Sequence, residues 1–158
     1  MFIQKKYLFV LILPVSLYFS CVKKKTYLIS PEIAYKNFTP FKGDSADMAV
    51  TFSDGDGDIG KDPGDSTKNL YMNYYYKDTI TQKFIAFYST TTDSLKTGYT
   101  IRKPDVSYKG KPISGEVNVR ISKYRHSAKI KTVKYVIYMY DNAGNKSNIV
   151  ITPEFAVP

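Results

Sequence analysis

Along most of this 158-residue chain, apolar and aromatic residues stand at every second position. Such runs start at Met48, Leu70, Val117 and Val133. In a β-strand, successive side chains lie on opposite faces, so a repeat of two residues indicates a strand with one apolar face. No run after the first twenty residues has the period and caps of a helix. We expect strands near residues 28–38, 46–53, 69–77, 80–89, 98–103, 114–122, 130–140 and 147–153. About seven or eight short strands at this spacing predict an all-β, antiparallel sandwich.

Short polar segments between these runs predict the turns. Lys77-Asp78-Thr79 is typical of a tight hairpin, and the segment from Asp141 to Asn145 is typical of a second one. Asn, Asp and Gly favour both turns because they adopt the backbone angles that hairpins need.

The first residues have the layout of a secretory signal peptide. Lys5 and Lys6 precede an apolar run from Tyr7 to Phe19, which is short for a membrane span. The only cysteine, Cys21, follows Ser20 at the end of this run, and this resembles the lipobox at which bacterial lipoproteins are cleaved and lipidated. An ordinary signal peptide with an incidental cysteine is the alternative. We therefore expect residues 1–20 to be a lipoprotein signal peptide, 21–29 to hold the lipidated Cys21 and a basic tether, and 30–158 to form one domain.

The chain is basic, with a formal net charge of +9, which removal of the leader with Lys5 and Lys6 lowers by two. Basic charge can indicate nucleic acid, but a secretory leader and the lack of a compact Arg/Lys recognition motif predict no nucleic-acid partner. Lys23, Lys24 and Lys25 would instead meet anionic lipid head groups beside the anchor, at about 1 kcal/mol each. A solvated tether is the alternative for these lysines.

Three aspartates alternate with glycines in the segment Asp54-Gly55-Asp56-Gly57-Asp58-Ile59-Gly60. Three like charges so close together repel one another unless a cation lies among them, and hard cations such as calcium prefer oxygen ligands. We therefore predict that Asp54, Asp56 and Asp58 bind Ca²⁺. The alternative is an Asp/Gly loop whose carboxylates stay solvated or cap backbone amides.

Two further acids follow this segment at the spacing of an EF-hand loop. Counted from Asp54 as position 1, Asp62 and Asp65 fall at positions 9 and 12. Ile59 replaces the EF-hand glycine, Asp65 replaces the usual Glu, and no flanking helix is predicted. We therefore expect a calcium loop of the extracellular β-module kind, with Asp62 and Asp65 as additional candidate ligands.

Four segments together resemble a family of small Bacteroidota lipoproteins with an immunoglobulin-like domain and no assigned activity. They are Pro31-Glu32-Ile33, the stretch from Phe52 to Gly60, Asn69-Leu70-Tyr71, and the stretch from Tyr140 to Asn148. The resemblance implies an immunoglobulin-like β-sandwich in the cell envelope. Surface-exported members often carry acidic residues after the cysteine, so the lysines here favour a periplasm-facing outer-membrane location.

An immunoglobulin-like fold places the loop after its second strand and the loop before its last strand at the same end. Asp141, with Asn142 and Asn145, would then complete the oxygen shell around the metal. Turn chemistry alone is the alternative for these three residues.

The chain has fifteen tyrosines and no tryptophan. If exposed, Tyr71, Tyr74, Tyr75 and Tyr76 would be candidate contacts for a glycan or protein partner, because aromatic rings anchor such ligands. Filling of the core and the outer sheet face is the alternative.

The sequence offers little for catalysis. His126 is the only histidine, and it lies in a basic stretch that we expect to be a surface loop. No nucleophile with a base and an orienting acid is evident, nor a phosphate loop, zinc spacing or dinucleotide fingerprint. We predict that the protein is not an enzyme but a membrane-anchored, calcium-binding module with an unidentified partner.

Overall fold

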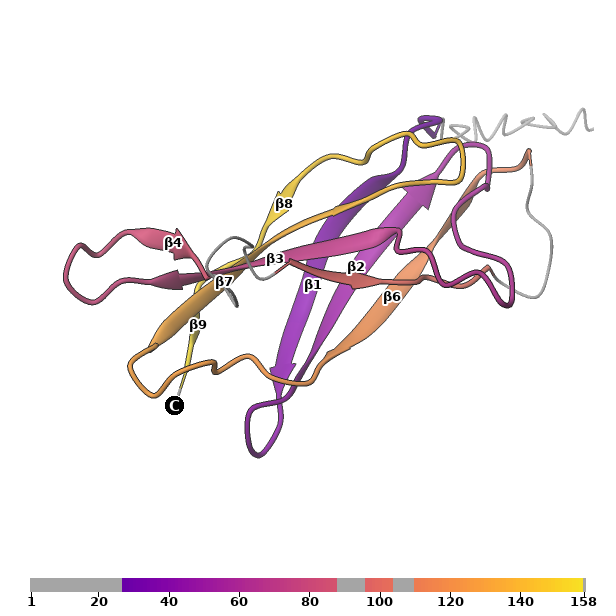
Figure 1. Cartoon of the computed structure of the whole chain (residues 1–158). Helices are drawn as coiled ribbons and strands as arrows, with labels where there is room; N and C mark the ends of the chain where they lie inside the picture. The colour runs from indigo at the N-terminus through magenta and orange to yellow at the C-terminus, as the bar shows by residue number, and fades with distance from the viewer. Residues whose placement is uncertain (1–26, 88–95, 104–109, 158) are drawn as a thin grey trace, which may run out of the picture.

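The computed structural model describes residues 27–87, 96–103 and 110–157. The expected signal peptide, Cys21 and the lysines of the tether lie outside this range. Within the described residues, the regular structure consists of nine β-strands and no helix (Figure 1). Consequently, the described part of the chain holds no helix of the length and apolarity needed to cross a membrane.

The first sheet contains three antiparallel strands. These are β1 (Glu32–Pro40), β2 (Ala46–Asp54) and β6 (Ile113–Ile121), with β2 in the centre. All nine residues of β2 pair with β6, from Ala46 opposite Ile121 to Asp54 opposite Ile113. The last residue of β2 therefore marks the same end of the sandwich as the first residue of β6.

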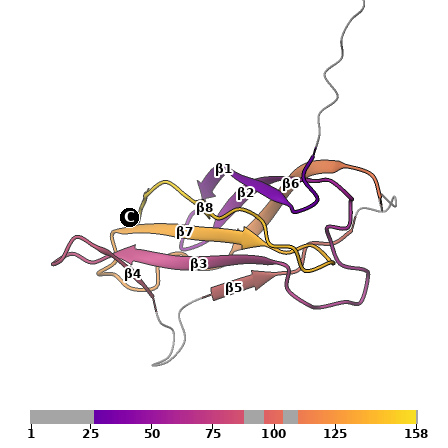
Figure 2. The same cartoon turned by 90° about the horizontal axis from the view of Figure 1, so that it is seen from above.

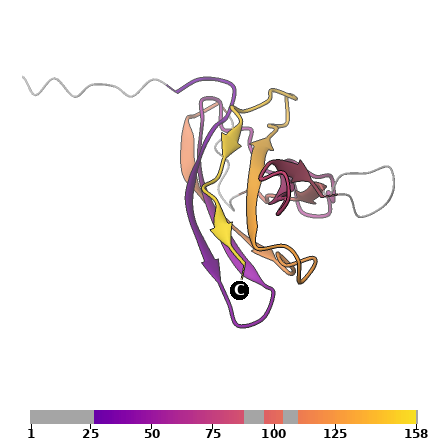
Figure 3. The same ribbon diagram turned by 90° about the vertical axis from the view of Figure 1, so that its left-hand side faces the viewer.

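The second sheet is built around the antiparallel pair β3 (Leu70–Lys77) and β7 (Thr132–Met139). Two strands pair with β3, namely β4 (Phe84–Ala86) and β5 (Lys96–Tyr99). Two short strands pair with β7, namely β8 (Val150–Ile151) and β9 (Phe155–Ala156). Figures 2 and 3 show the two sheets as separate layers, with β1 and β2 in one and β3 and β7 in the other.

The core lies between these layers and follows the sequence alternation. Met48 and Val50 face inward from β2, and Met72, Tyr74 and Ile137 face inward from the second sheet, each buried. Because every second residue of each strand is large and apolar, both sheets present a continuous hydrophobic face to each other. The prediction of an immunoglobulin-like antiparallel sandwich is confirmed.

One side chain joins the two sheets at the edge of β1. The amide of Asn148, which precedes β8, accepts a hydrogen bond from Ile33 N (2.7 Å) and donates one to Ile33 O (2.8 Å). The Asn148 side chain thus takes the place of the backbone of a neighbouring strand, and pairs the amide and carbonyl of an edge-strand residue that would otherwise lack hydrogen-bond partners on that side.

The strand boundaries differ from prediction at several places. Of the described residues in the expected strand 80–89, only Phe84–Ala86 form a strand, and β5 spans Lys96–Tyr99 instead of 98–103. The prediction of a tight hairpin at Lys77–Thr79 is wrong. Residues 78–83 form a longer loop, because Asp78 Oδ1 accepts hydrogen bonds from the backbone amides of Ile80 and Thr81. The expected strand 147–153 is shortened to β8, since Tyr135 N bonds to the Thr152 hydroxyl instead of a strand carbonyl, and β9 lies beyond the expected range. The described residues before Glu32 are not strand, and Leu28 is exposed.

Candidate metal site

The acidic loop, which we define as residues 54–60, begins where the central strand of the first sheet ends. Asp54 is the last residue of β2 and its side chain is 0 % exposed. The alternation of the strand turns it inward, so a carboxylate stands at a position where a sandwich normally carries an apolar residue. Burial of a carboxylate without a charged partner is costly, and this position therefore requires a specific explanation.

Asp54, Asp56 and Asp58 converge on one point. One oxygen from each lies within 4.8 Å of the others, and the group could hold a metal ion. The Oδ1 atom of each is buried and has no hydrogen-bond partner in the described structure. Three unpaired carboxylate oxygens at one place are far from the usual state of buried polar atoms, nearly all of which are hydrogen-bonded.

Backbone amides hold the opposite oxygens of two of these carboxylates. Asp54 Oδ2 accepts a hydrogen bond from Asp58 N (3.0 Å), and Asp58 Oδ2 accepts one from Ala143 N (2.9 Å). Each carboxylate is thereby oriented by one oxygen while the other remains available. This is the arrangement that supporting hydrogen bonds give to metal-binding carboxylates.

Burial and neighbouring negative charge raise the pKa values of two of these carboxylates, Asp54 and Asp58. Burial, followed by repulsion from Asp56 and Asp58, raises the pKa of Asp54 to about 6. Burial also raises the pKa of Asp58, with the charges of Asp141 and Asp56 acting in the same direction. None of the ion pairs in the described part of the chain involves Asp54, Asp56 or Asp58. The negative charge is therefore not balanced by any described side chain.

The last hairpin lies against this loop, as the immunoglobulin-like topology predicts. Asn142 Nδ2 donates to the backbone carbonyls of Asp58 (2.6 Å) and Gly60 (2.7 Å). Asn145 donates from its backbone and its side chain to the carboxylate of Asp141, which is 3 % exposed. Both asparagines thus act as donors that fix the loops, which differs from the expectation that their oxygens face the metal. Asp141 contributes charge beside the group, and its ligation of a metal stays a prediction.

The other two candidate ligands point elsewhere. Both oxygens of Asp62 accept hydrogen bonds from Lys103 Nζ, at 2.8 and 2.9 Å. Asp65 Oδ1 accepts hydrogen bonds from the backbone and hydroxyl of Thr67, which lower the pKa of Asp65. Among the described residues, the group of converging carboxylate oxygens consists of Asp54, Asp56 and Asp58.

Close backbone contacts explain two of the glycines in the acidic loop. A Cβ atom on Gly55 would lie 2.5 Å from the Leu28 carbonyl oxygen, so the start of the domain packs directly on the loop. A Cβ atom on Gly60 would lie 2.8 Å from Lys103 N, and Gly60 also has a φ of +96°. Only glycine meets these demands without strain.

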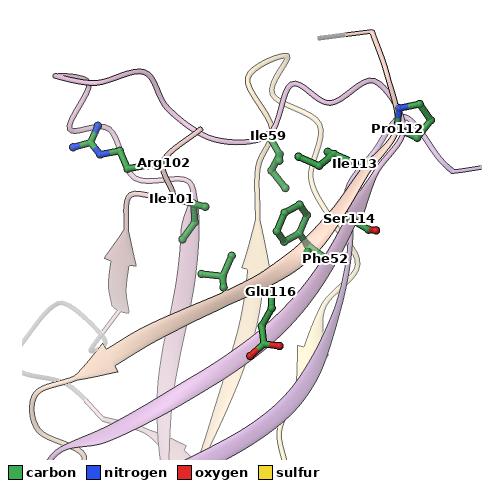
Figure 4. Close-up of a pocket in the computed structure, with 10 residues that line it drawn as sticks. Phe52, Ile59, Ile101, Arg102, Pro112, Ile113, Ser114 and Glu116 are labelled. Carbon is green, nitrogen blue, oxygen red and sulfur yellow. The ribbon is translucent and has the colours of Figure 1, made fainter. Parts of the chain in front are cut away.

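The loop is also tied to the core through Ile59, which is 2 % exposed. Ile59, Phe52 and Ile113 point toward one another at the side of a cleft of about 530 Å³ (Figure 4). Because Ile59 directly follows Asp58, this packing fixes the last carboxylate of the group relative to β2 and β6.

Sequence reasoning missed one residue that positions the site. Asn69, 1 % exposed, accepts hydrogen bonds from Ile101 N through its side chain (2.7 Å) and from Tyr140 N through its backbone (2.8 Å). It therefore links the segment beside Gly60 to the residue before Asp141. Its only sequence signal is a polar residue directly before a strongly apolar strand.

The four candidate tyrosines do not form one exposed row. Tyr74 is 2 % exposed, and its hydroxyl donates to the Tyr124 carbonyl (2.9 Å), so it belongs to the core. Tyr71 stacks on Tyr138 with ring centroids 5.3 Å apart, on the outer face. Tyr75 and Tyr76 are partly buried.

Comparison with protein-family models, curated proteins and solved structures finds no match to this chain. Fold and site together define an all-β, immunoglobulin-like sandwich domain that carries a group of three inward-facing aspartates at one end.

Proposed function

We propose that this protein is a lipid-anchored module of the cell envelope whose immunoglobulin-like domain binds one structural calcium ion in the acidic loop. The observation that carries the proposal is the set of three buried, unpaired Oδ1 atoms of Asp54, Asp56 and Asp58. A dication between them would satisfy all three and offset the burial and the repulsion that together raise the pKa of Asp54 to about 6.

The donor set favours calcium among the common metals. All three donors are carboxylate oxygens, which suit hard cations, whereas zinc and copper sites use imidazole or thiolate. With Ca–O bonds of about 2.4 Å, two ligands on opposite sides of one ion lie about 4.8 Å apart. The three oxygens, all within 4.8 Å of one another, therefore fit one calcium ion with little movement.

The ion would act by joining the two sheets. Asp54 ends a strand of the first sheet, while Asp58 is hydrogen-bonded to Ala143 in the hairpin that follows β7 of the second. Calcium bound to both aspartates would hold the acidic loop against this hairpin.

The anchor rests on the sequence alone. Cys21 and the basic residues after it support attachment to the periplasmic face of the outer membrane, with lysine side chains against anionic head groups. The partner that such an anchored module would serve is a separate question from the metal.

Thermal unfolding of the full-length chain in detergent tests the calcium proposal. We expect millimolar calcium to raise the melting temperature relative to chelator, because a ligand that binds only the folded state stabilises it. Asp58→Asn should abolish most of this increase. Asp62→Asn is the matched control, since its carboxylate pairs with Lys103 outside the group, and should keep the full increase. Equal melting temperatures of the wild type with calcium and with chelator would contradict the proposal.

A further inference from the structure

The two edges of the first sheet differ in how they are protected against pairing with another chain. β1 has a register shift between Tyr35 and Asn37, contains Lys36 and Pro40, and is hydrogen-bonded to Asn148 on its outer side. Bulges, lysines, prolines and covering segments all keep an edge strand from pairing with a further strand. On the opposite edge, the nine residues of β6 pair with β2 without a register shift and include neither lysine nor proline. No described strand pairs with the other side of β6, which we call the free edge (Figure 1).

The pairing of the other strands determines which backbone groups lie on the free edge. Ile33 makes hydrogen bonds to Asn148 through both its amide and its carbonyl, so these groups point away from β2. Ile33 pairs with Phe52, and Phe52 pairs with Gly115 of β6. In an antiparallel sheet the direction alternates along each strand, so Phe52 points to β6 and Gly115 points back to β2. The even-numbered residues of β6 therefore direct their amides and carbonyls to the free edge, and they are Ser114, Glu116, Asn118 and Arg120.

The side chains of these four residues are also exposed, and their charges select one way of pairing with a second copy of the chain. A two-fold axis at the free edge would make the two β6 strands antiparallel. With the axis at Asn118, Glu116 of each copy lies directly opposite Arg120 of the other, and both residues point their backbone groups across the joint. With the axis at Val117 or Val119, one of these charges would face Asn118 instead. The axis at Asn118 is therefore the register in which opposite charges pair directly.

This register also continues a pattern of alternating charge that each sheet already has. Lys36 on β1 pairs with Glu116, and Asp47 on β2 pairs with Arg120. Across the joint, positive Lys36 and negative Glu116 of one copy would be followed by positive Arg120 and negative Asp47 of the second copy. The free edge is therefore complementary to itself in both its backbone groups and its charges.

We propose that two copies of this chain pair through the free edges of β6, about a two-fold axis at Asn118. The pairing joins their three-stranded sheets into one continuous sheet. Val117 of each copy then lies opposite Val119 of the other on the inner face of that sheet.

Disulfide trapping in the full-length chain tests the proposal. Cys21→Ser removes the only native thiol, and Asn118→Cys then places one thiol at the axis. The two Cα atoms at this position would lie about 5.5 Å apart, a distance that a disulfide spans. Ser114→Cys in the same background is the matched control, because Ser114 is exposed on the same strand and face. In this register Ser114 would lie about 27 Å from its counterpart, at about 3.4 Å per residue.

With copper phenanthroline as the oxidant, Asn118→Cys should form disulfide-linked dimer on the order of ten-fold faster than Ser114→Cys, because a disulfide cannot span the larger distance. Equal rates for the two variants, or no dimer from Asn118→Cys, would overturn the proposal.

Reversed charges test the register by a second route. In the background of Cys21→Ser and Asn118→Cys, Glu116→Arg sets two positive charges against each other across the joint, and Arg120→Glu sets two negative charges against each other. Each variant alone should therefore form dimer more slowly. An equimolar mixture of the two variants restores opposite charges between the copies and should form mixed dimer faster than either variant forms its own. Because mixing repairs only contacts between copies, a mixture that is no faster than its components would refute this register.

Discussion

Replacement of Asp54 by asparagine should stabilise the protein in the presence of a chelator. Asparagine keeps the shape of the side chain and an oxygen for the amide of Asp58, which lies 3.0 Å from Asp54 Oδ2. What it removes is one of three charges whose oxygens lie within 4.8 Å of one another. Substitution of a buried, hydrogen-bonded residue usually lowers the free energy of unfolding, so an increase caused by Asp54→Asn would be unusual and is a strict test.

The size of the effect follows from Coulomb's law. Two unit charges about 5 Å apart repel by roughly 3 kcal/mol at an effective dielectric constant of about 20. Three such pairs would amount to roughly 10 kcal/mol, comparable with the whole stability of a typical domain. Relaxation of the loop reduces this, and we expect Asp54→Asn to gain about 2 kcal/mol near neutral pH, or about 5–10 °C in melting temperature.

Calcium should act in the opposite direction. At ten- to hundred-fold excess over the dissociation constant, calcium stabilises the wild type by about 1.4–2.7 kcal/mol, and Asp54→Asn by much less. The gap between the two proteins should therefore close or reverse.

Differential scanning calorimetry of the wild type and Asp54→Asn, each with chelator and with calcium, measures these differences in stability. Asp62→Asn is the control, and its melting temperature should equal that of the wild type under both conditions. The reasoning is refuted if Asp54→Asn is less stable than the wild type in chelator, because the carboxylate would then stabilise the fold without any cation.

Three further predictions concern other parts of the molecule. Gly55→Ala should cost about 1–3 kcal/mol in urea unfolding, because its Cβ would collide with the Leu28 backbone. Gly115→Ala should cost less, because its Cβ would approach only the ring of Phe52, at 3.1 Å. Burial lowers the pKa of His126 in the folded state, so its contribution to the unfolding free energy should decline as pH falls from about 7 to 5. His126→Phe should therefore show a flatter dependence of unfolding free energy on pH. A pH dependence identical to that of the wild type would contradict the burial of this ring. Cys21→Ser should release the protein from the membrane fraction of expressing cells, and unchanged fractionation would refute the lipid anchor.

The fold could be predicted from the sequence because the alternation of apolar and polar residues is regular where the strands are long. Val133, Tyr135 and Ile137 stand at every second position and all three are buried, as expected. The errors lie where side chains replace backbone pairing. Asp78 caps a loop with its own carboxylate, and Thr152 takes the place of a strand carbonyl, and neither contact leaves a periodic signal.

The candidate metal site could be predicted from the sequence only in part. Three acids at alternate positions predicted the convergence of Asp54, Asp56 and Asp58, because short spacing along the chain limits their separation. Spacing alone did not separate them from Asp62, whose partner Lys103 lies 41 residues away in sequence. The donor roles of Asn142 and Asn145, and the link through Asn69, depend on contacts between distant segments that composition does not encode.

Direct calcium binding is the most decisive measurement for the account as a whole. Isothermal titration of the chelator-treated full-length chain should show one calcium ion per chain, with magnesium binding more weakly. A variant with Asp54, Asp56 and Asp58 all replaced by asparagine should bind none. Absence of binding at millimolar calcium, or equal binding by this triple variant, would contradict the central claim that three buried carboxylates share one cation.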